Sequence, residues 1–156
     1  MKKEKIALLL AYFEEQNKIL KELINELKSL KISDKKDTVY IGFLLHNLYC
    51  ALEDLMEETA KTFENTLDDT SKYHRELLKK MLLNVKGIRP QLWSSDSFRL
   101  LDELRGFRHI FRHAYGYELD SKKVFEMQDK IVKNWLKIVK DIEKFKKFLE
   151  EILKNE

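Results

Sequence analysis

The chain has 156 residues, which suits a single domain large enough to bury a substantial core. Hydrophobic residues make up 44% of the chain and charged residues 37%. The positive and negative charges nearly balance, and the formal net charge of +3 does not by itself indicate nucleic-acid binding. The single cysteine, Cys50, excludes an internal disulfide and suits a reducing cytosol.

Hydrophobic residues recur at helical spacing through most of the sequence, and no stretch shows sustained strand alternation. The first predicted helix covers residues 3–31. Its apolar start, IALLLAYF, continues with helical spacing instead of reaching a cleavage site, so we do not interpret it as a signal peptide. A second helix is predicted over residues 38–65, after the polar break SDKKD. A third covers residues 72–85, after DDTS, which supplies a stop and a new N-cap.

The sequence KGIRPQLWSSDS predicts a loop before the fourth helix. Gly87 suits a helix C-cap there, and Pro90 prevents the helix from continuing. The fourth helix is expected to begin after a cap at Ser95 or Asp96 and to end near Gly116.

Asp120 or Ser121 is expected to cap a fifth helix that extends to about Leu153. These elements predict an all-α protein: one antiparallel bundle of four or five helices that spans residues 1–156 as a single domain. No apolar stretch approaches the roughly 20 residues that cross a membrane, so we expect a cytoplasmic protein with no membrane partner.

The predicted fourth helix contains most of the arginine in the chain. Two of the four histidines, His109 and His113, lie in the same segment. The planar guanidinium group of arginine donates paired hydrogen bonds to phosphate, and histidine exchanges protons near neutral pH. The segment therefore predicts a site that binds and processes phosphate groups. Four of the six arginines lie there: Arg99, Arg105, Arg108 and Arg112.

Projection onto an ideal helix, at about 100° per residue, divides this segment into two faces. An apolar side combines Leu100, Leu104, Phe107, Ile110, Phe111 and Ala114. A polar arc combines Arg105, Arg108, Arg112 and Tyr115, with His109 and His113 beside it. The simpler interpretation of the polar arc is that it is the solvated side of an amphipathic helix. The residue types argue against this interpretation, because the other exposed faces of the protein use Lys and Glu, whereas this one uses Arg and His.

Arg108, four intervening residues, His113, Ala114 and Tyr115 form the pattern R-x4-H-x-Y. This pattern, within FRHIFRHAYGYELD, resembles the HepT-like toxin branch of the HEPN superfamily of helical nucleotide-binding and ribonuclease domains. The upstream segment GFLLHNLYCALEDL and the loop that contains Arg-Pro are similar to that branch as well. The resemblance extends from about Val39 to Val124.

The resemblance implies a metal-independent endoribonuclease that needs no cofactor and acts on RNA as a homodimer, with the motifs of two protomers in one cleft. It also implies a type VII-like toxin–antitoxin system, in which a nucleotidyltransferase antitoxin neutralises the toxin and can adenylylate the motif tyrosine. By position, Arg108 and His113 would be catalytic and Tyr115 the modification target. A non-catalytic HEPN module that binds nucleotide or a partner remains an alternative, and so does a structural helical adaptor.

This chemistry suits the residues. Cleavage of RNA without metal needs a base for the 2′-hydroxyl and donors for the phosphoryl oxygens, and His113 and Arg108 can supply them. Arg105, His109 and Arg112 are candidate phosphate-binding residues. On an ideal helix Arg108 and His113 lie roughly 140° apart, so a second protomer would help to complete the site.

Two other interpretations concern the same histidines and the second helix. His109 and His113 are four residues apart, the spacing of two metal ligands on one helical turn. Nothing in the sequence indicates which residue would be the third ligand, with Glu103, His46 and His74 as candidates. The nearby arginines also repel a cation, so we predict no metal site. His46, Asn47, Glu53 and Asp54 are either ordinary polar residues of the second helix or include one that contacts the fourth helix and orients Arg108 or His113. Cys50 is expected to be a small core residue.

Overall fold

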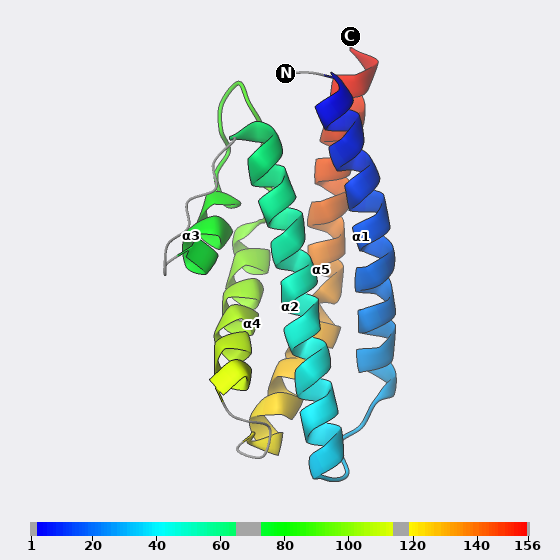
Figure 1. Ribbon diagram of the computed structural model, residues 1–156, viewed down its shortest axis with the longest axis vertical. Coiled ribbons are helices and arrows are strands. Elements are labelled where there is room, and N and C mark those ends of the chain that lie inside the picture. Colours follow the sequence, from blue (N-terminus) through cyan, green and yellow to red (C-terminus); the bar gives the residue numbers. More distant parts are fainter. Residues whose placement is uncertain (1–2, 65–72, 114–118, 156) are drawn as a thin grey trace.

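Four long helices alternate in direction and pack side by side (Figure 1). The computed structural model describes residues 3–64, 73–113 and 119–155, which form five α-helices and no β-strand. The long helices are α1 (Lys3–Ser29), α2 (Lys35–Phe63), α4 (Ser95–His113) and α5 (Ser121–Lys154), and the short α3 (Tyr73–Lys80) packs against α2 and α4. The predicted all-α antiparallel bundle is therefore confirmed.

The helix α2 occupies the centre of the arrangement. It contacts each of the other four helices, whereas α1 and α4 lie on opposite sides and each contact α2 and α5. The core between them is aromatic as well as aliphatic. Phe13 of α1 stacks on Phe145 of α5 with ring centroids 5.5 Å apart. Trp93, which precedes α4 in the sequence by two residues, is fully buried.

The helix α4 begins at a serine that is anchored to α5. Ser94 accepts a hydrogen bond from the Ser97 backbone amide at 3.3 Å, so the cap is Ser94 and not the predicted Ser95 or Asp96. The Ser94 amide and hydroxyl both donate to Asp141 at 2.9 Å. This bond pair explains the shift, because Ser94 is the serine that α5 holds in place. At α5 itself, Asp120 caps as predicted, accepting from Lys122 at 2.9 Å.

The helix α3 is shorter than predicted, and Gly87 does not cap it. The helix ends at Lys80, and Val85 and Arg89 then exchange backbone hydrogen bonds of 2.8 and 2.9 Å around a tight turn. Gly87 has φ 80° in that turn, so its left-handed backbone serves the turn.

Arg89 joins this turn to the ends of α2 and α3. Its side chain is fully buried, and its Nε donates to the Glu64 carboxylate at 3.0 Å. Its two terminal nitrogens donate to the backbone oxygens of Lys80, Leu83 and Pro90 at 3.0–3.1 Å. One side chain therefore donates to one oxygen of a carboxylate and to three carbonyl oxygens.

Several predictions concern residues outside the described part of the chain. They include the DDTS cap, the end of the fourth helix near Gly116, and the positions of Ala114 and Tyr115. Among the helices that the structure describes, none has the length and apolarity of a membrane span.

Candidate functional site

Arg108 lies half-buried on α4, against α2. Its guanidinium carbon is 5.9 Å from the centre of the Tyr49 ring. Burial alone would lower the pKa of Arg108, but a hydrogen bond from its side chain to Cys50 and the charges of Cys50 and Glu53 outweigh this effect and raise the pKa. Its Nε is buried and makes no hydrogen bond to the described residues.

The buried position of Arg108 differs from the solvent-facing arc that the helical projection predicts. Arg108 follows Leu101 by seven residues, about two turns, and Leu101 is fully buried. The buried arc of α4 therefore extends to Arg108 on one side. On the other side it stops short of Ile110, which is 55% exposed, so the prediction of Ile110 as a core residue was wrong.

The Arg108 guanidinium lies over Tyr49 of α2, and it interacts electrostatically with three more residues of that helix. These four residues, called here the α2 stripe, are His46, Tyr49, Cys50 and Glu53. Their spacing of three and four residues places them on one face of the helix. Cys50 is half-buried, so it belongs to this polar stripe and not to the apolar core that was predicted for it; its Sγ lies 3.7 Å from His46 Nε2.

His46 of α2 packs against the Phe111 end of α4. Its ring lies 5.5 Å from that of Phe111, centroid to centroid. Burial lowers the pKa of His46, and the positive charges of Arg108 and Arg112 lower it further, which favours the neutral ring. Asp54, by contrast, is exposed, and its charge acts on Tyr12 of α1.

Glu53 and Tyr49 complete the stripe in a buried setting. One oxygen of the Glu53 carboxylate lies 2.7 Å from His74 Nδ1 of α3, and only 8% of the Glu53 side chain is exposed. Burial, followed by the charge of Glu53, raises the pKa of Tyr49. The sequence contained a signal for this group, namely polar residues at spacings of three and four within an apolar helix.

Gly42 sets the separation of α2 and α4 beside the stripe. A β-carbon at this position would lie 3.0 Å from the Phe111 ring and 3.3 Å from Leu119. Such contacts are too close without a shift of the neighbours. The absence of a side chain therefore allows Phe111 to pack on α2 next to His46.

The remaining residues of the polar arc lie nearer to solvent. His109 and His113 are exposed and pack edge to face, with ring centroids 4.6 Å apart. Arg112 is exposed, and Arg105 pairs with Asp102 at 2.9 Å. The structure thus brings Arg108 to the α2 stripe and leaves His113 at the exposed end of α4. Tyr115 lies outside the described residues.

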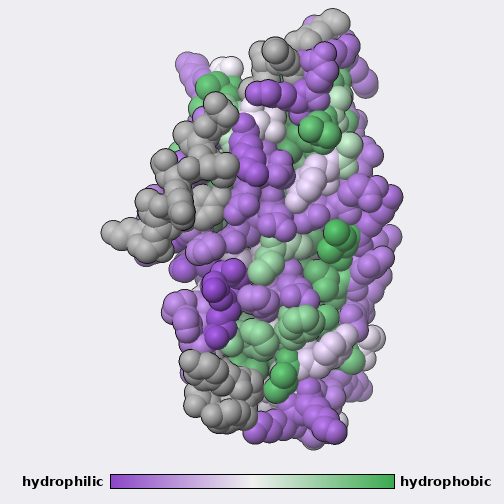
Figure 2. Space-filling model, in the orientation of Figure 1, coloured by the Kyte–Doolittle hydropathy of each residue, from purple (hydrophilic) through white to green (hydrophobic). Residues whose placement is uncertain are grey.

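Hydrophobic side chains are exposed beside this site. Figure 2 shows them gathered over the lower part of α2 and the adjoining part of α1, next to strongly hydrophilic side chains on the lower part of α4. The large hydrophobic side chains exposed on α2 are those of Tyr40 and Phe43, which are 42% and 47% exposed. Within the described ranges, no group of three or more His, Cys, Asp or Glu side chains is arranged to hold a metal ion.

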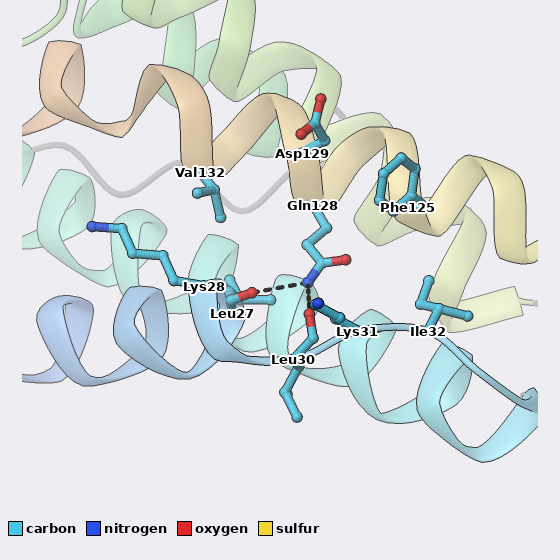
Figure 3. A pocket seen from close by; sticks show the side chains of 9 residues that line it. All are labelled: Leu27, Lys28, Leu30, Lys31, Ile32, Phe125, Gln128, Asp129 and Val132. Carbon is cyan, nitrogen blue, oxygen red and sulfur yellow. Dashed lines mark hydrogen bonds between the residues drawn. The ribbon is translucent and has the colours of Figure 1, made fainter.

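A pocket of about 390 Å³ lies elsewhere, between the end of α1, the turn after it and the first half of α5 (Figure 3). Its central polar residue is Gln128, whose Nε2 donates to the carbonyl oxygens of Leu27 at 2.8 Å and Leu30 at 2.9 Å. These bonds satisfy orphan carbonyls at the C-terminal end of α1, so we interpret Gln128 as a structural residue.

Comparison with protein families gives one finding. The family described as "HepT-like protein" matches residues 40–149, which include the α2 stripe, all of α4 and most of α5. Comparisons with curated proteins and with solved structures found no match. The family match covers more than half of the chain and contains every described residue of the candidate site; the chain belongs to the HepT-like family, a family of HEPN-type toxins.

Proposed function

We propose that this protein is an endoribonuclease toxin that cleaves RNA without a metal ion, with Arg108 and His113 as its catalytic residues. The observation that carries the proposal is the setting of Arg108. This arginine of the R-x4-H pattern is held half-buried on a polar stripe of α2, inside the region that matches the HepT-like family. A solvated helix face would not need such a setting.

The two residues have complementary roles in the proposed reaction. His113 exchanges protons with the 2′-hydroxyl or the leaving oxygen, and Arg108 donates hydrogen bonds to the phosphoryl oxygens. Arg105, His109 and Arg112, on the same helix, bind neighbouring phosphates. The exposed pair of His109 and His113 is accessible to RNA.

We further propose that the protein acts as a homodimer. Arg108 is directed to α2 whereas His113 lies at the exposed end of α4, so one cleft needs groups from two protomers. The exposed Tyr40, Phe43 and Ile110 are suitable contacts for a second copy, because large apolar surfaces beside a polar site favour association.

Cleavage of total RNA by the purified protein in the presence of a chelator tests the proposal. We expect fragments from the wild type. None should come from a double variant, Arg108→Ala/His113→Ala, that is purified in the same way and controls for contaminating nucleases. Salt-dependent RNA binding without cleavage would instead favour the non-catalytic module, and absence of both would favour an adaptor.

The partner of the toxin is proposed to be a nucleotidyltransferase antitoxin that adenylylates Tyr115. Co-expression with such an antitoxin should add the mass of one or more adenylates to the wild-type chain, as measured by intact-protein mass spectrometry. The variant Tyr115→Phe should gain none, since it lacks the acceptor hydroxyl. Addition of the same mass to Tyr115→Phe would move the target to another residue, with Tyr117 the next to test.

A further inference from the structure

A row of apolar side chains runs along one face of α5. It consists of Phe125, Val132, Leu136 and Val139, called here the α5 row. Val132 is half-buried and the other three are exposed, with 69% of Leu136 accessible to solvent. On an ideal helix the four positions lie within about 60° of one another. Exposed apolar residues that gather on one face, instead of standing singly, mark a surface for a partner.

One end of the α5 row lines the pocket between α1 and α5. Phe125 and Val132 lie on the α5 side of this space of about 390 Å³, and Lys28 lies on the α1 side (Figure 3). The hydrogen bonds of Gln128 to the end of α1 join the two sides. A preformed hollow beside an apolar row can take a large side chain of a partner, as the anchor residues of protein interfaces require.

The charges beside the α5 row are mostly positive. Lys28 and Lys31 line the pocket on the α1 side. Lys133 and Lys140 are exposed on α5 and directly follow residues of the row. The pocket lining contains one carboxylate, Asp129, and it already pairs with Lys133 at 3.0 Å. A surface with apolar side chains between lysines is complementary to a segment that combines apolar and acidic residues.

The spacing of the row indicates that this segment is a helix. Its members follow one another by seven, four and three residues, which are the steps that separate a and d positions in a pair of packed helices. A helix laid along α5 would therefore meet one apolar side chain after another. The pocket would take a side chain near one end of that helix.

A second copy of α5 is a poor occupant of the row. Asp129 and Glu143 lie seven residues before and after Leu136, on the same face of the helix. Antiparallel pairing of two rows about Leu136 would therefore set these carboxylates against each other. Parallel pairing would oppose each lysine of the row to its own copy. Like charges in such positions disfavour pairing, so the surface suits a different chain.

We propose that the α5 row and its pocket bind an amphipathic helix of a protein partner, which places apolar residues on the row and acidic residues opposite the lysines. The inference goes beyond the proposed RNA cleavage and does not depend on it. The surface belongs to α5 and to the end of α1, whereas Arg108 and His113 lie on α4. The homodimer proposed above uses α2 and α4, so it leaves the row free.

Two synthetic helical peptides test this surface. Both have about three heptads with leucine at the a and d positions; one carries glutamate at e and g, and the other carries lysine there. Each is labelled with fluorescein and titrated with the full-length protein, and binding is followed by fluorescence anisotropy. We expect the acidic peptide to bind at least about tenfold more tightly, because several exposed ion pairs form with it and are replaced by repulsion in the other.

The variant Leu136→Asp should weaken binding of the acidic peptide at least about tenfold, because it puts a charge in the apolar row. Its matched control is Leu8→Asp, which should bind as the wild type does. Leu8 is 73% exposed, but it lies beside the groove between α1 and α2. Both leucines are exposed, so both variants should fold. Lys28→Glu/Lys31→Glu should reverse the preference and favour the lysine peptide.

Equal affinity for the two peptides would overturn the proposal, and so would equal affinity of Leu136→Asp and the wild type for the acidic one. Two other occupants are tested with the same variant. A lower mass of Leu136→Asp than of the wild type in sedimentation equilibrium would show that a second copy covers the row. Binding of phosphatidylserine vesicles in place of the acidic peptide would show that the row meets a membrane surface. Either result would overturn the proposed helix.

Discussion

Alanine at Arg108 or at His113 should lower the rate of RNA cleavage by about 10²- to 10⁴-fold, the range expected for loss of an acid–base residue or of a preorganised oxyanion donor. Both variants should remain folded, since His113 is exposed and Arg108 is half-buried. The measurement is single-turnover cleavage of a labelled RNA. Arg99→Ala is the control, because Arg99 is exposed and pairs with Asp96 at the start of α4, away from the α2 stripe.

The same two variants test whether the cleft is shared between protomers. A heterodimer with one Arg108→Ala and one His113→Ala chain, isolated through two different affinity tags, should recover about half of the wild-type rate, because one of its two composite sites is intact. If Arg108 and His113 of the same chain acted together, both sites of the heterodimer would lack one catalytic residue and no activity would be recovered. A heterodimer as inactive as its parents would therefore contradict the shared cleft.

Alanine at Arg89 should cost about 3–5 kcal/mol of the free energy of unfolding, the range for breaking a buried ion pair by removing one partner. The change leaves the Glu64 carboxylate and three backbone carbonyls of the α3–α4 connection without their donor. Urea unfolding followed by far-UV circular dichroism, at one fixed protein concentration, measures the loss.

Arg99→Ala serves again as the matched control, because it removes an arginine whose carboxylate contact is exposed. Its effect on the free energy of unfolding should stay within about 0.5 kcal/mol. A loss below about 1 kcal/mol in Arg89→Ala would show that the connection finds other donors or water, and that the buried arginine is not what holds it.

The number, order and direction of the helices were predictable from the sequence because the apolar periodicity is long and rarely interrupted. Asp120, which caps α5, was predictable for a local reason: its carboxylate accepts from an amide two residues away. The start of α4 was not, because the choice of Ser94 over Ser95 depends on Asp141, 47 residues further along the chain. Nothing close to Ser94 in the sequence indicates that partner.

The candidate site shows the same limit. Arginine clustering and R-x4-H spacing located the α4 segment, but an ideal projection placed Arg108 with the solvated residues. Its true setting depends on how α4 rotates against α2, and therefore on Leu101, Phe107 and Phe111 together. The link between Glu53 and His74 crosses from α2 to α3, so periodicity within one helix does not reveal it.

The missing side chain at Gly42 has a mechanical consequence for α4. The N-terminal end of α4 is pinned to α5 through Ser94 and Asp141, while its other end rests on α2 through Phe111, in the space that Gly42 leaves. A methyl group at Gly42 would press on the Phe111 ring and push the C-terminal half of α4 away from α2, while the start of α4 stays attached to α5. The distance of Arg108 and His113 from α2 therefore depends on the absence of a side chain at this one position.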